Sequence, residues 1–383
     1  MSEVRPAAQL IEAVRAHAPG WSARSADGER QRSVPIETAT EILALGAHRL
    51  LQPRAFGGAQ GTVRDHVEVV AATAEACTSA GWCLAVWSVH NWMAAQLDPQ
   101  GQAEVWSDPA AAISASIVPR VKFTASEAGV EITGRFPFGS GADHAAWFGI
   151  GGLIELERIV EPLIAFVPGS AVTIDQASWF VMGLSGTGSK DLVVAAPVVV
   201  PWQRVLRMRQ VNGRQAAGQV APAAALYRAP FRPVATLVLA PPALGAARAA
   251  LARFVARLDG HALPFAGKSS QRQDAAARLR VAESSAQIDA AALVLGFAAD
   301  ECERLGKSAA AEPVAEARVG RDAAYAVRLC AQAVDRLYEA AGGSALAQSE
   351  PLQRHWRDVM AVRAHAVLTW DAAATTFADA YLG

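Results

Sequence analysis

The sequence predicts an α+β protein, mostly α-helical, in which a small β-domain lies between two helical regions. Two observations predict this fold class. Apolar residues recur at helical spacing near both ends, whereas the centre holds short β-branched segments punctuated by Gly, Pro and Asp. With 383 residues, 52% of them hydrophobic, the chain can bury a large core in two or three subdomains. The expected boundaries are an N-terminal helical domain at 1–108, a middle β-domain at 109–205 and a C-terminal helical bundle at 206–383.

The individual elements follow from the same patterns. Helices are expected at 5–18, 37–51, 63–78 and 81–97, with a break at 52–58, where a proline is followed by a pair of glycines. Strands are expected at 111–118, 121–124, 129–133, 147–154, 162–167 and 192–200. A loop near a pocket, or a linker, is expected at 207–232, followed by long helices at 274–305, 315–341 and 352–381.

The composition excludes several classes of function. The formal net charge is −1, so no long-range field attracts nucleic acid or an anionic membrane. No apolar run reaches the ~18 residues that a membrane span needs, and the N-terminal residues lack the apolar segment of a secretory signal. The four cysteines form no C-x-x-C pair, so no metal site is expected. A cytoplasmic protein without a metal is therefore the expectation.

Two glycine-rich stretches in the β-region predict a cofactor site. The first, at 134–147, contains Gly-Ser-Gly between two predicted strands, where backbone N–H groups and a hydroxyl can approach a flat ligand closely. The second, at 183–191, precedes a strand. It lacks the ending of a phosphate-binding P-loop, but its hydroxyls and N–H groups can bond ring carbonyls or a phosphate.

Two histidines are expected on apolar helical faces. His90 follows Trp82 and Val86 at intervals of four residues, which places an imidazole on an aromatic face. His365 lies on a second apolar face near the C-terminus. For both residues the alternative to a catalytic role is a core histidine bonded to a backbone carbonyl.

Other polar residues fit structural interpretations. Ser114 and Ser116 share one face of a predicted strand, and no G-x-S-x-G motif makes either of them a hydrolase nucleophile. A polar outer face is the plain interpretation of this pair. Arg354 and Asp358, four residues apart on a predicted helix, are expected to form an ion pair.

Three motifs together resemble the acyl-CoA dehydrogenase fold. They are Gly-Arg-Phe-Pro-Phe-Gly-Ser-Gly at 134–141, Gly-Thr-Gly-Ser-Lys-Asp at 186–191, and Ala-Gly-Gly-Ser at 341–344 followed by Leu-Gln-Arg-His-Trp-Arg-Asp at 352–358. More closely, the chain resembles the group D flavoprotein monooxygenases, the oxygenase components of two-component systems that hydroxylate phenols and indoles. The resemblance implies an acyl-CoA dehydrogenase-like architecture in which the C-terminal region is a four-helix bundle.

The resemblance also implies a role for each candidate residue. A separate flavin reductase would supply FADH2 or FMNH2, and the flavin would react with O2 to oxygenate a small aromatic substrate through a flavin hydroperoxide. The implied catalytic residues are His90, Ser116 and His365. The implied cofactor-binding residues are Phe138, Ser140, Gly141, Gly186, Thr187, Gly188, Ser189, Gly342 and Gly343. In a homotetramer, part of 271–273 or the 342–344 turn would reach a neighbouring subunit's flavin. The substrate pocket is expected to hold Trp82, Asn91, Trp92 and Tyr227.

One departure separates the chain from the acyl-CoA dehydrogenases. Those enzymes carry a glutamate base about two helical turns after the Arg-Asp pair, whereas 359–367 hold no carboxylate and His365 stands near that place. We therefore expect a monooxygenase that hydroxylates or epoxidises a phenol- or indole-type ring. An acyl-CoA dehydrogenase or oxidase with an atypical base and a non-catalytic flavin-binding homologue are the alternatives. The choice between FAD and FMN stays open.

Overall fold

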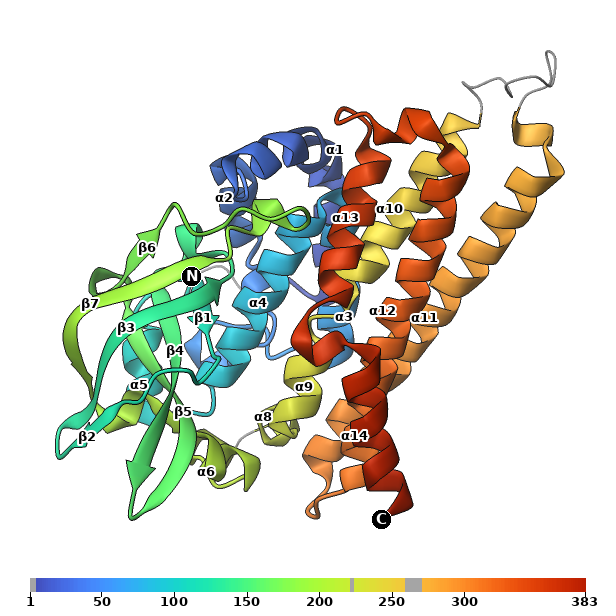
Figure 1. The fold of residues 1–383 in the computed structure, drawn as a ribbon. Helices are drawn as coiled ribbons and strands as arrows, with labels where there is room; N and C mark the ends of the chain where they lie inside the picture. The colour runs from blue at the N-terminus through green and yellow to red at the C-terminus, as the bar shows by residue number, and fades with distance from the viewer. Residues whose placement is uncertain (1–4, 221–223, 259–270) are drawn as a thin grey trace.

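The computed structural model describes residues 5–220, 224–258 and 271–383, and it places two small sheets on one side of a larger helical body (Figure 1). The helices before the sheets are α1 (Ala7–Gln31), α2 (Ile36–Leu45), α3 (Val63–Ala76), α4 (Thr78–Ala94) and α5 (Pro99–Val105). Those after the sheets are α6 (Met208–Asn212), α7 (Ala217–Val220), α8 (Ala225–Arg228), α9 (Phe231–Leu237), α10 (Pro241–Arg257), α11 (Ala275–Lys307), α12 (Pro313–Ala341), α13 (Pro351–Arg363) and α14 (Trp370–Leu382). The predicted α+β class, mostly α, is confirmed.

The strands form two four-stranded sheets that pack over a second hydrophobic cluster. The strands are β1 (Ile113–Ser116), β2 (Thr124–Ser126), β3 (Gly129–Gly139), β4 (Trp147–Leu156), β5 (Ile159–Pro168), β6 (Thr173–Asp175), β7 (Lys190–Val200) and β8 (Val205–Arg207). One sheet has the order β1-β4-β5-β8 and the other β2-β3-β7-β6. Only β1 and β4 pair in parallel among these strands, and the inner faces bury Phe136, Phe148 and Ile150.

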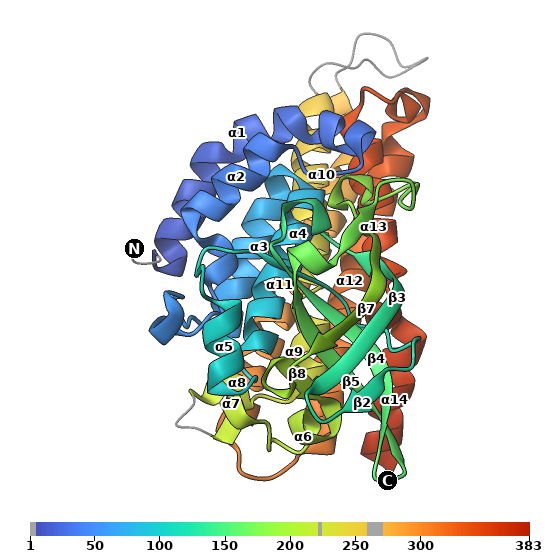
Figure 2. The ribbon, with the colours of Figure 1, turned by 90° about the vertical axis from the view of Figure 1, so that its left-hand side faces the viewer.

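Helix α4 is the element against which the rest of the site is built. It contains no charged residue, and every residue from Thr78 to Ala94 is buried. A helix that is apolar on all sides belongs inside a protein. Figures 1 and 2 show α4 between the sheets and the C-terminal helices.

The helices before and after the sheets share one hydrophobic core. Helix α3 packs against α10, and α10, α11, α12 and α13 pack side by side as the implied four-helix bundle. Helix α3 starts at a capping box, in which Thr62 and Asp65 exchange two hydrogen bonds of 3.0 and 2.8 Å. The strands lie between Ile113 and Arg207. The domain boundaries at 108 and 205 stay a prediction.

Several sequence-based expectations about the elements are wrong. The helix expected at 5–18 continues to Gln31, and the helix expected at 37–51 ends at Leu45. Strand β3 continues through 134–139 with two shifts in its pairing to β7, so the first glycine-rich turn begins only at Ser140. The helix expected at 352–381 is two helices, α13 and α14, joined by a short 3-10 turn at Ala366–Leu368. The loop expected at 207–232 contains α6, α7 and α8 within its described residues.

Two helical stretches, Phe231–Arg257 and Ala275–Lys307, are long and apolar enough to cross a membrane by length and composition alone. The first is interrupted between α9 and α10, and 72% of its most apolar window is buried inside the protein. The second is α11, with 33% of its window buried. A core helix passes this test as readily as a membrane span does, so the first stretch is accounted for by the protein core.

Candidate functional site

Three side chains of α4 tie the helix to the edge of both sheets. The indole Nε1 of Trp82 donates to Ser140 Oγ at 3.2 Å, and that of Trp87 donates to the Gly141 carbonyl at 3.3 Å. The Nδ1 atom of His90 lies 2.9 Å from the Ile113 carbonyl on β1. The helix therefore fixes the end of β3 and the start of β1 relative to each other.

A chain of hydroxyl groups connects the two glycine-rich turns. Ser140 Oγ lies 2.7 Å from Ser189 Oγ, and Ser189 Oγ lies 2.7 Å from Thr187 Oγ1. Thr187 Oγ1 donates to the Leu184 carbonyl at 2.7 Å. Together with the bond from Trp82, these contacts form one continuous network across α4, the end of β3 and the turn before β7. The two glycine-rich turns that the sequence assigns to one cofactor site therefore lie side by side.

The backbone of these turns is held in an uncommon conformation. Phe138, Gly141 and Gly188 have φ values of 69°, 67° and 53°. Phe138 is an unfavourable residue at such an angle, and its ring is nevertheless 53% exposed, edge-on to Trp179 at 6.3 Å. A strained aromatic residue that keeps its ring in solvent is typical of a ligand-binding position.

His90 is held as a neutral base. A carbonyl oxygen only accepts hydrogen bonds, so Nδ1 carries the proton towards Ile113 and Nε2 keeps its lone pair. Burial is the main cause that lowers the pKa of His90 to about 4. The ring is therefore neutral at pH 7, not poised near ~6.5 as an unperturbed imidazole would be.

His365 meets the same cluster from the other side. It lies in the turn after α13, not on a helical face, and its ring centroid is 5.4 Å from that of Trp82. Its Nδ1 is buried without a protein partner, and burial lowers its pKa. An unpaired buried nitrogen is costly unless a ligand bonds it.

The strand serines are buried. The hydroxyl of Ser114 donates to the Ser140 carbonyl at 2.8 Å, and that of Ser116 donates to the Pro137 carbonyl at 2.5 Å. A polar outer face is therefore the wrong interpretation of this pair. Both residues brace the end of β3, beside the turn that carries Gly141.

The three other expected substrate residues have structural partners in the core. Asn91 bonds the His48 and Trp87 carbonyls and accepts from Trp106, while the Trp92 indole donates to the Leu226 carbonyl and the Tyr227 hydroxyl donates to the Leu51 carbonyl. All three side chains are 4% exposed or less. Their polar atoms are used within the protein, and their place in the substrate pocket stays a prediction.

The remaining cofactor positions separate into two places. Gly186 lies in the 3-10 turn Ser185–Thr187, beside the hydroxyl chain. Gly342 and Gly343 follow α12 at the far end of the bundle, with no atom within 4 Å of a Cβ built on either. The structure does not bring this second pair to the cluster around Ser140. The side chain of Gln271 lies outside the described residues, and 272–273 belong to a short turn before α11.

Sequence reasoning named two ionic residues behind the turn but missed their contacts. Lys190 is 2% exposed and pairs with Asp143 at 2.7 Å, which ties the start of β7 to the turn after β3. Asp358 accepts from the Leu184 N–H at 2.6 Å. The predicted Arg354–Asp358 ion pair is wrong, because Arg354 pairs with Glu29 on α1 at 3.1 Å. No local spacing signals either long-range contact.

A flat ring cofactor with hydrogen-bonding edges fits these residues. The exposed ring of Phe138 offers an apolar wall, and the unpaired Nδ1 of His365 offers a polar atom without a partner. Thr187 and Ser189 carry hydroxyls in the second glycine-rich turn, bonded to each other and to Ser140. Across the described ranges, no group of three His, Cys, Asp or Glu residues is placed to hold a metal ion.

The fold and the site together define a flavin-binding protein of the acyl-CoA dehydrogenase type. Residues 237–370 match the family model of the acyl-CoA dehydrogenase C-terminal domain. Over the whole chain, the similarity is to a narrower group. The chain is 34% identical over 366 residues, covering 94% of this chain and 92% of the relative, to the oxygenase subunit HsaA of a flavin-dependent monooxygenase from Mycobacterium tuberculosis. It is 31% identical, with 100% and 96% covered, to the oxygenase component of an FADH2-dependent resorcinol hydroxylase from Rhizobium.

The solved structures agree. The 3-HSA hydroxylase from Rhodococcus superposes with a TM-score of 0.91 at 30% identity, covering 98% of this chain and 97% of the other. XiaF from Streptomyces, in complex with FADH2 and glycerol, superposes with a TM-score of 0.90 at 25% identity, covering 98% and 96%. The chain belongs to the flavin-dependent monooxygenase oxygenase components, enzymes that use reduced flavin and O2, as the motif resemblance implies.

Proposed function

We propose that this enzyme hydroxylates a small phenol- or indole-type ring and that His90 takes the proton of the ring's O–H or N–H group. The observation that carries the proposal is the 2.9 Å bond from His90 Nδ1 to the Ile113 carbonyl. It fixes the tautomer in which Nε2 is the base. Removing the substrate proton raises the electron density of the ring, which then reacts more readily with an electrophilic oxygen.

The substrates named for the relatives support this class of ring. Besides the resorcinol hydroxylase, they include p-hydroxyphenylacetate 3-hydroxylase and indole-3-acetate monooxygenase from Acinetobacter baumannii, at 27% and 26% identity. Phenols and indoles both carry an O–H or N–H donor on an electron-rich ring, and the lone pair of His90 Nε2 can accept from either. A single neutral imidazole serves both.

The other site residues hold and shield the reactants. Reduced flavin, FADH2 or FMNH2 from a partner reductase, supplies activated O2 when bound. Phe138, Gly141, Thr187 and Ser189 are assigned to the flavin ring. Ser116 and His365 are assigned to hydrogen bonds at the reacting edge, and the buried Trp82 excludes water, which would otherwise divert the oxygen to peroxide.

The test is a coupled assay with a flavin reductase, NADH and a panel of phenols and indoles. The wild type should give an oxygenated product, and His90→Ala should consume NADH with peroxide as the main product. His66→Ala is the matched control, because His66 is an equally buried histidine bonded to Ser88 and Val238 away from the site. Full coupling in His90→Ala contradicts the assignment of the base, and peroxide alone across the whole panel contradicts the proposed reaction.

The acyl-CoA dehydrogenase alternative is not supported by this site. The family's glutamate base has no counterpart here, because 359–367 hold no carboxylate and His365 lies in the turn near that place. Bleaching of bound oxidised flavin on addition of an acyl-CoA would favour that alternative.

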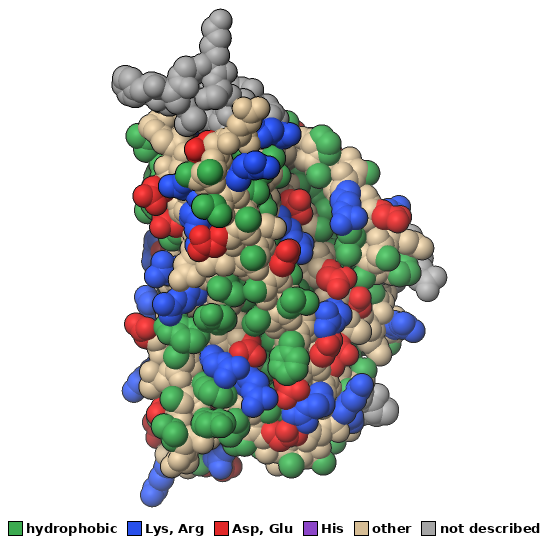
Figure 3. All heavy atoms as spheres, turned by 90° about the vertical axis from the view of Figure 1, so that its right-hand side faces the viewer, with side chains coloured by type: hydrophobic (Ala, Val, Ile, Leu, Met, Phe, Trp, Pro, Cys, Tyr) green, Lys and Arg blue, Asp and Glu red, His purple; other side chains and the backbone are tan. Residues whose placement is uncertain are grey.

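We also infer a cytoplasmic homotetramer in which the outer face of α11 contacts another subunit. Leu279, Leu293 and Phe297 project from this helix and are each more than half exposed. Figure 3 shows hydrophobic side chains over this side of the molecule, interspersed with charged groups. Light scattering should give four subunits for the wild type and fewer for Leu293→Glu. Binding of the protein to lipid vesicles, lost in the same variant, would instead point to a membrane contact.

A further inference from the structure

The turn that carries the hydroxyl chain is fastened to α13. Asp358 Oδ1 accepts from the Leu184 N–H at 2.6 Å, and the Arg357 guanidinium donates to the Met182 carbonyl. Both residues belong to the Arg-Asp pair on which the motif resemblance partly rests. The segment 182–189 is thus held at its start by two side chains of one helical turn.

The packing at this contact leaves no space for adjustment. A Cβ on Gly183 would lie 2.2 Å from the Arg357 carbonyl, so the turn rests directly on the backbone of α13. Leu184 has a φ of 55°, an unfavourable angle for a leucine, and both of its backbone polar groups are bonded, the N–H to Asp358 and the carbonyl to Thr187. The Asp358 bond therefore offsets part of the strain in Leu184.

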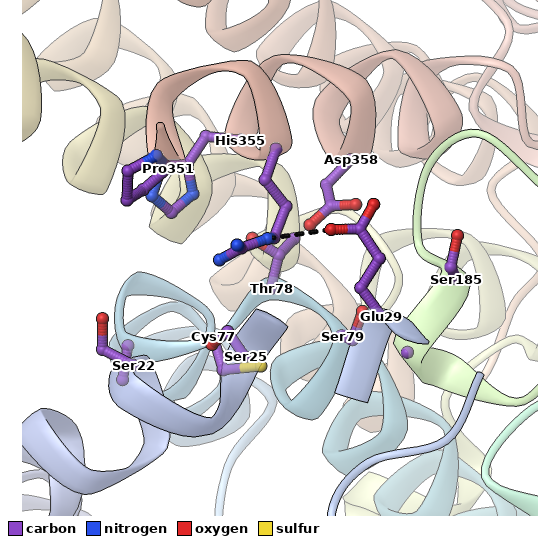
Figure 4. Close-up of a pocket in the computed structure, with 13 residues that line it drawn as sticks. Ser22, Ser25, Glu29, Cys77, Thr78, Ser79, Ser185, Pro351, His355 and Asp358 are labelled. Carbon is purple, nitrogen blue, oxygen red and sulfur yellow. Dashed lines mark hydrogen bonds and ion pairs between the residues drawn. The ribbon is translucent and has the colours of Figure 1, made fainter. Parts of the chain in front are cut away.

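The charges around Asp358 are arranged so that its carboxylate is available to the turn. Glu29 of α1 pairs with both Arg354 and Arg357, which removes the helical neighbours that would otherwise pair with Asp358. Figure 4 shows the side chains of Glu29 and Asp358 next to each other in this pocket. The carboxylate faces a cavity of about 20 Å³ behind the turn. The titratable and charged groups around it are Glu29, Cys77, Arg354, His355 and Arg357.

We propose that Asp358 is a positioning residue of the flavin site, which sets the conformation of the 183–189 turn and, through Thr187 and Ser189, the hydroxyls that reach Ser140 and Trp82. The proposal rests on the proposed function, in which these hydroxyls contact the flavin. Asp358 itself lies behind the turn and touches no reactant. Its effect passes through one backbone N–H and three successive hydroxyl groups.

The burial of Asp358 adds a dependence on pH. Burial is the main cause that raises the pKa of this carboxyl to about 6, against the opposing effect of the Leu184 N–H. The carboxylate accepts a stronger hydrogen bond than the neutral acid does. The turn is therefore held more firmly above pH 6 than below it.

The test compares Asp358→Ala with Asp358→Asn. The asparagine keeps an oxygen that accepts from Leu184 but cannot titrate, whereas the alanine removes the acceptor. Asp335→Ala is the control, because Asp335 accepts from Trp356 of α13 at 2.9 Å and has no contact with the turn. Amide hydrogen exchange of 183–189 and the dissociation constant of reduced flavin are measured on each folded variant.

We expect the amide of Leu184 to exchange faster in Asp358→Ala and reduced flavin to bind about tenfold more weakly, a loss typical of one charge-assisted hydrogen bond. Asp358→Asn should keep the wild-type exchange rate of the Leu184 amide and the wild-type affinity for reduced flavin. Its flavin affinity should not change between pH 5 and 7, whereas that of the wild type should. Should Asp358→Ala be unstable, the missing pH response of Asp358→Asn still tests the role.

The outcomes separate the two proposals. Unchanged exchange at 183–189 in Asp358→Ala, or a pH response that persists in Asp358→Asn, overturns the positioning role. Faster exchange with unaltered flavin binding also overturns it, because the contact would then serve stability alone. A wild type that binds no reduced flavin counts against the proposed function, and the exchange measurement remains interpretable in that case.

Discussion

The ring of His365 lies 5.4 Å from the indole of Trp82, and the same indole donates to Ser140 at 3.2 Å. One side chain of α4 thus contacts both the turn after α13 and the end of β3. The helical bundle and the sheets meet at Trp82, and a disturbance on either side reaches the other through it. This relationship makes Trp82 a better test of the site than either partner alone.

Replacing Trp82 by Phe should weaken flavin binding without unfolding the protein. The phenyl ring keeps the apolar contact with His365, but Ser140 loses a hydrogen-bond donor. We expect the dissociation constant for reduced flavin to rise about fivefold, which corresponds to about 1 kcal/mol. Trp92→Phe loses a comparable bond to the Leu226 carbonyl on the same helix and should leave the affinity unchanged. If both variants weaken flavin binding equally, the loss comes from altered packing of α4 and not from the Trp82–Ser140 hydrogen bond.

The pH dependence of the reaction should reflect the burial of His90. With its pKa lowered to about 4, the ring stays neutral and able to accept a proton from pH 8 down to about pH 5. The amount of product formed per NADH should therefore be constant across this range. Reduced flavin is kept at a saturating concentration, because the effect of Asp358 on flavin affinity then does not alter the measurement. A fall with an apparent pKa near ~6.5 would mean that His90 titrates as an exposed imidazole does.

Substitution of Gly141 should damage both the fold and the site. Its φ is 67°, and an added Cβ would lie 2.5 Å from Trp87 Nε1. Gly141→Ala is expected to lower the free energy of unfolding by about 2 kcal/mol, from strain and overpacking together. Gly320→Ala is the control, since that glycine lies within α12 with open space around it and alanine favours a helix by about 1 kcal/mol. Urea titration of the two variants should therefore give shifts of opposite sign.

Local pattern predicted the order of the regions and most of the elements, because the period of apolar residues changes where helices give way to strands. It failed where a long-range contact decides the structure. The segment 364–369 contains no glycine or proline, yet α13 ends at Arg363, where His365 turns to meet Trp82 and Leu368 enters the core. Nothing in the spacing of these residues marks the break.

The same limit explains the errors in the candidate site. Because α4 is buried on all sides, its sequence does not distinguish the face with Trp82 and His90 from the face with Asn91 and Trp92. Arg354 and Asp358 have the spacing of an ion pair, but a glutamate 325 residues away takes the arginine. The two glycine-rich turns were found because their residue types are constrained locally, by positive φ at Gly141 and Gly188.

Acid should destabilise the protein through its buried histidines, and His66 is the clearest case. The Val238 carbonyl accepts from Nε2 and Ser88 lies 3.2 Å from Nδ1, so the ring is held neutral, and burial lowers its pKa to about 4. In the unfolded chain the pKa is near ~6.5, so between these values only the unfolded state binds the proton. The stability that His66 contributes is therefore complete above about pH 6.5 and is lost as the pH falls to 4, by about 3 kcal/mol.

The raised pKa of Asp358 acts in the opposite direction. That carboxyl binds a proton more tightly in the folded state, so its contribution is present below about pH 4 and is lost as the pH rises through 6. Urea unfolding of the wild type, His66→Gln and Asp358→Asn between pH 4 and 7 separates the two effects. We expect the slope of stability against pH to become shallower in His66→Gln and steeper in Asp358→Asn. If neither variant changes this slope, other groups cause the acid sensitivity. The next to test would be the buried His48, because its pKa is also lowered to about 4.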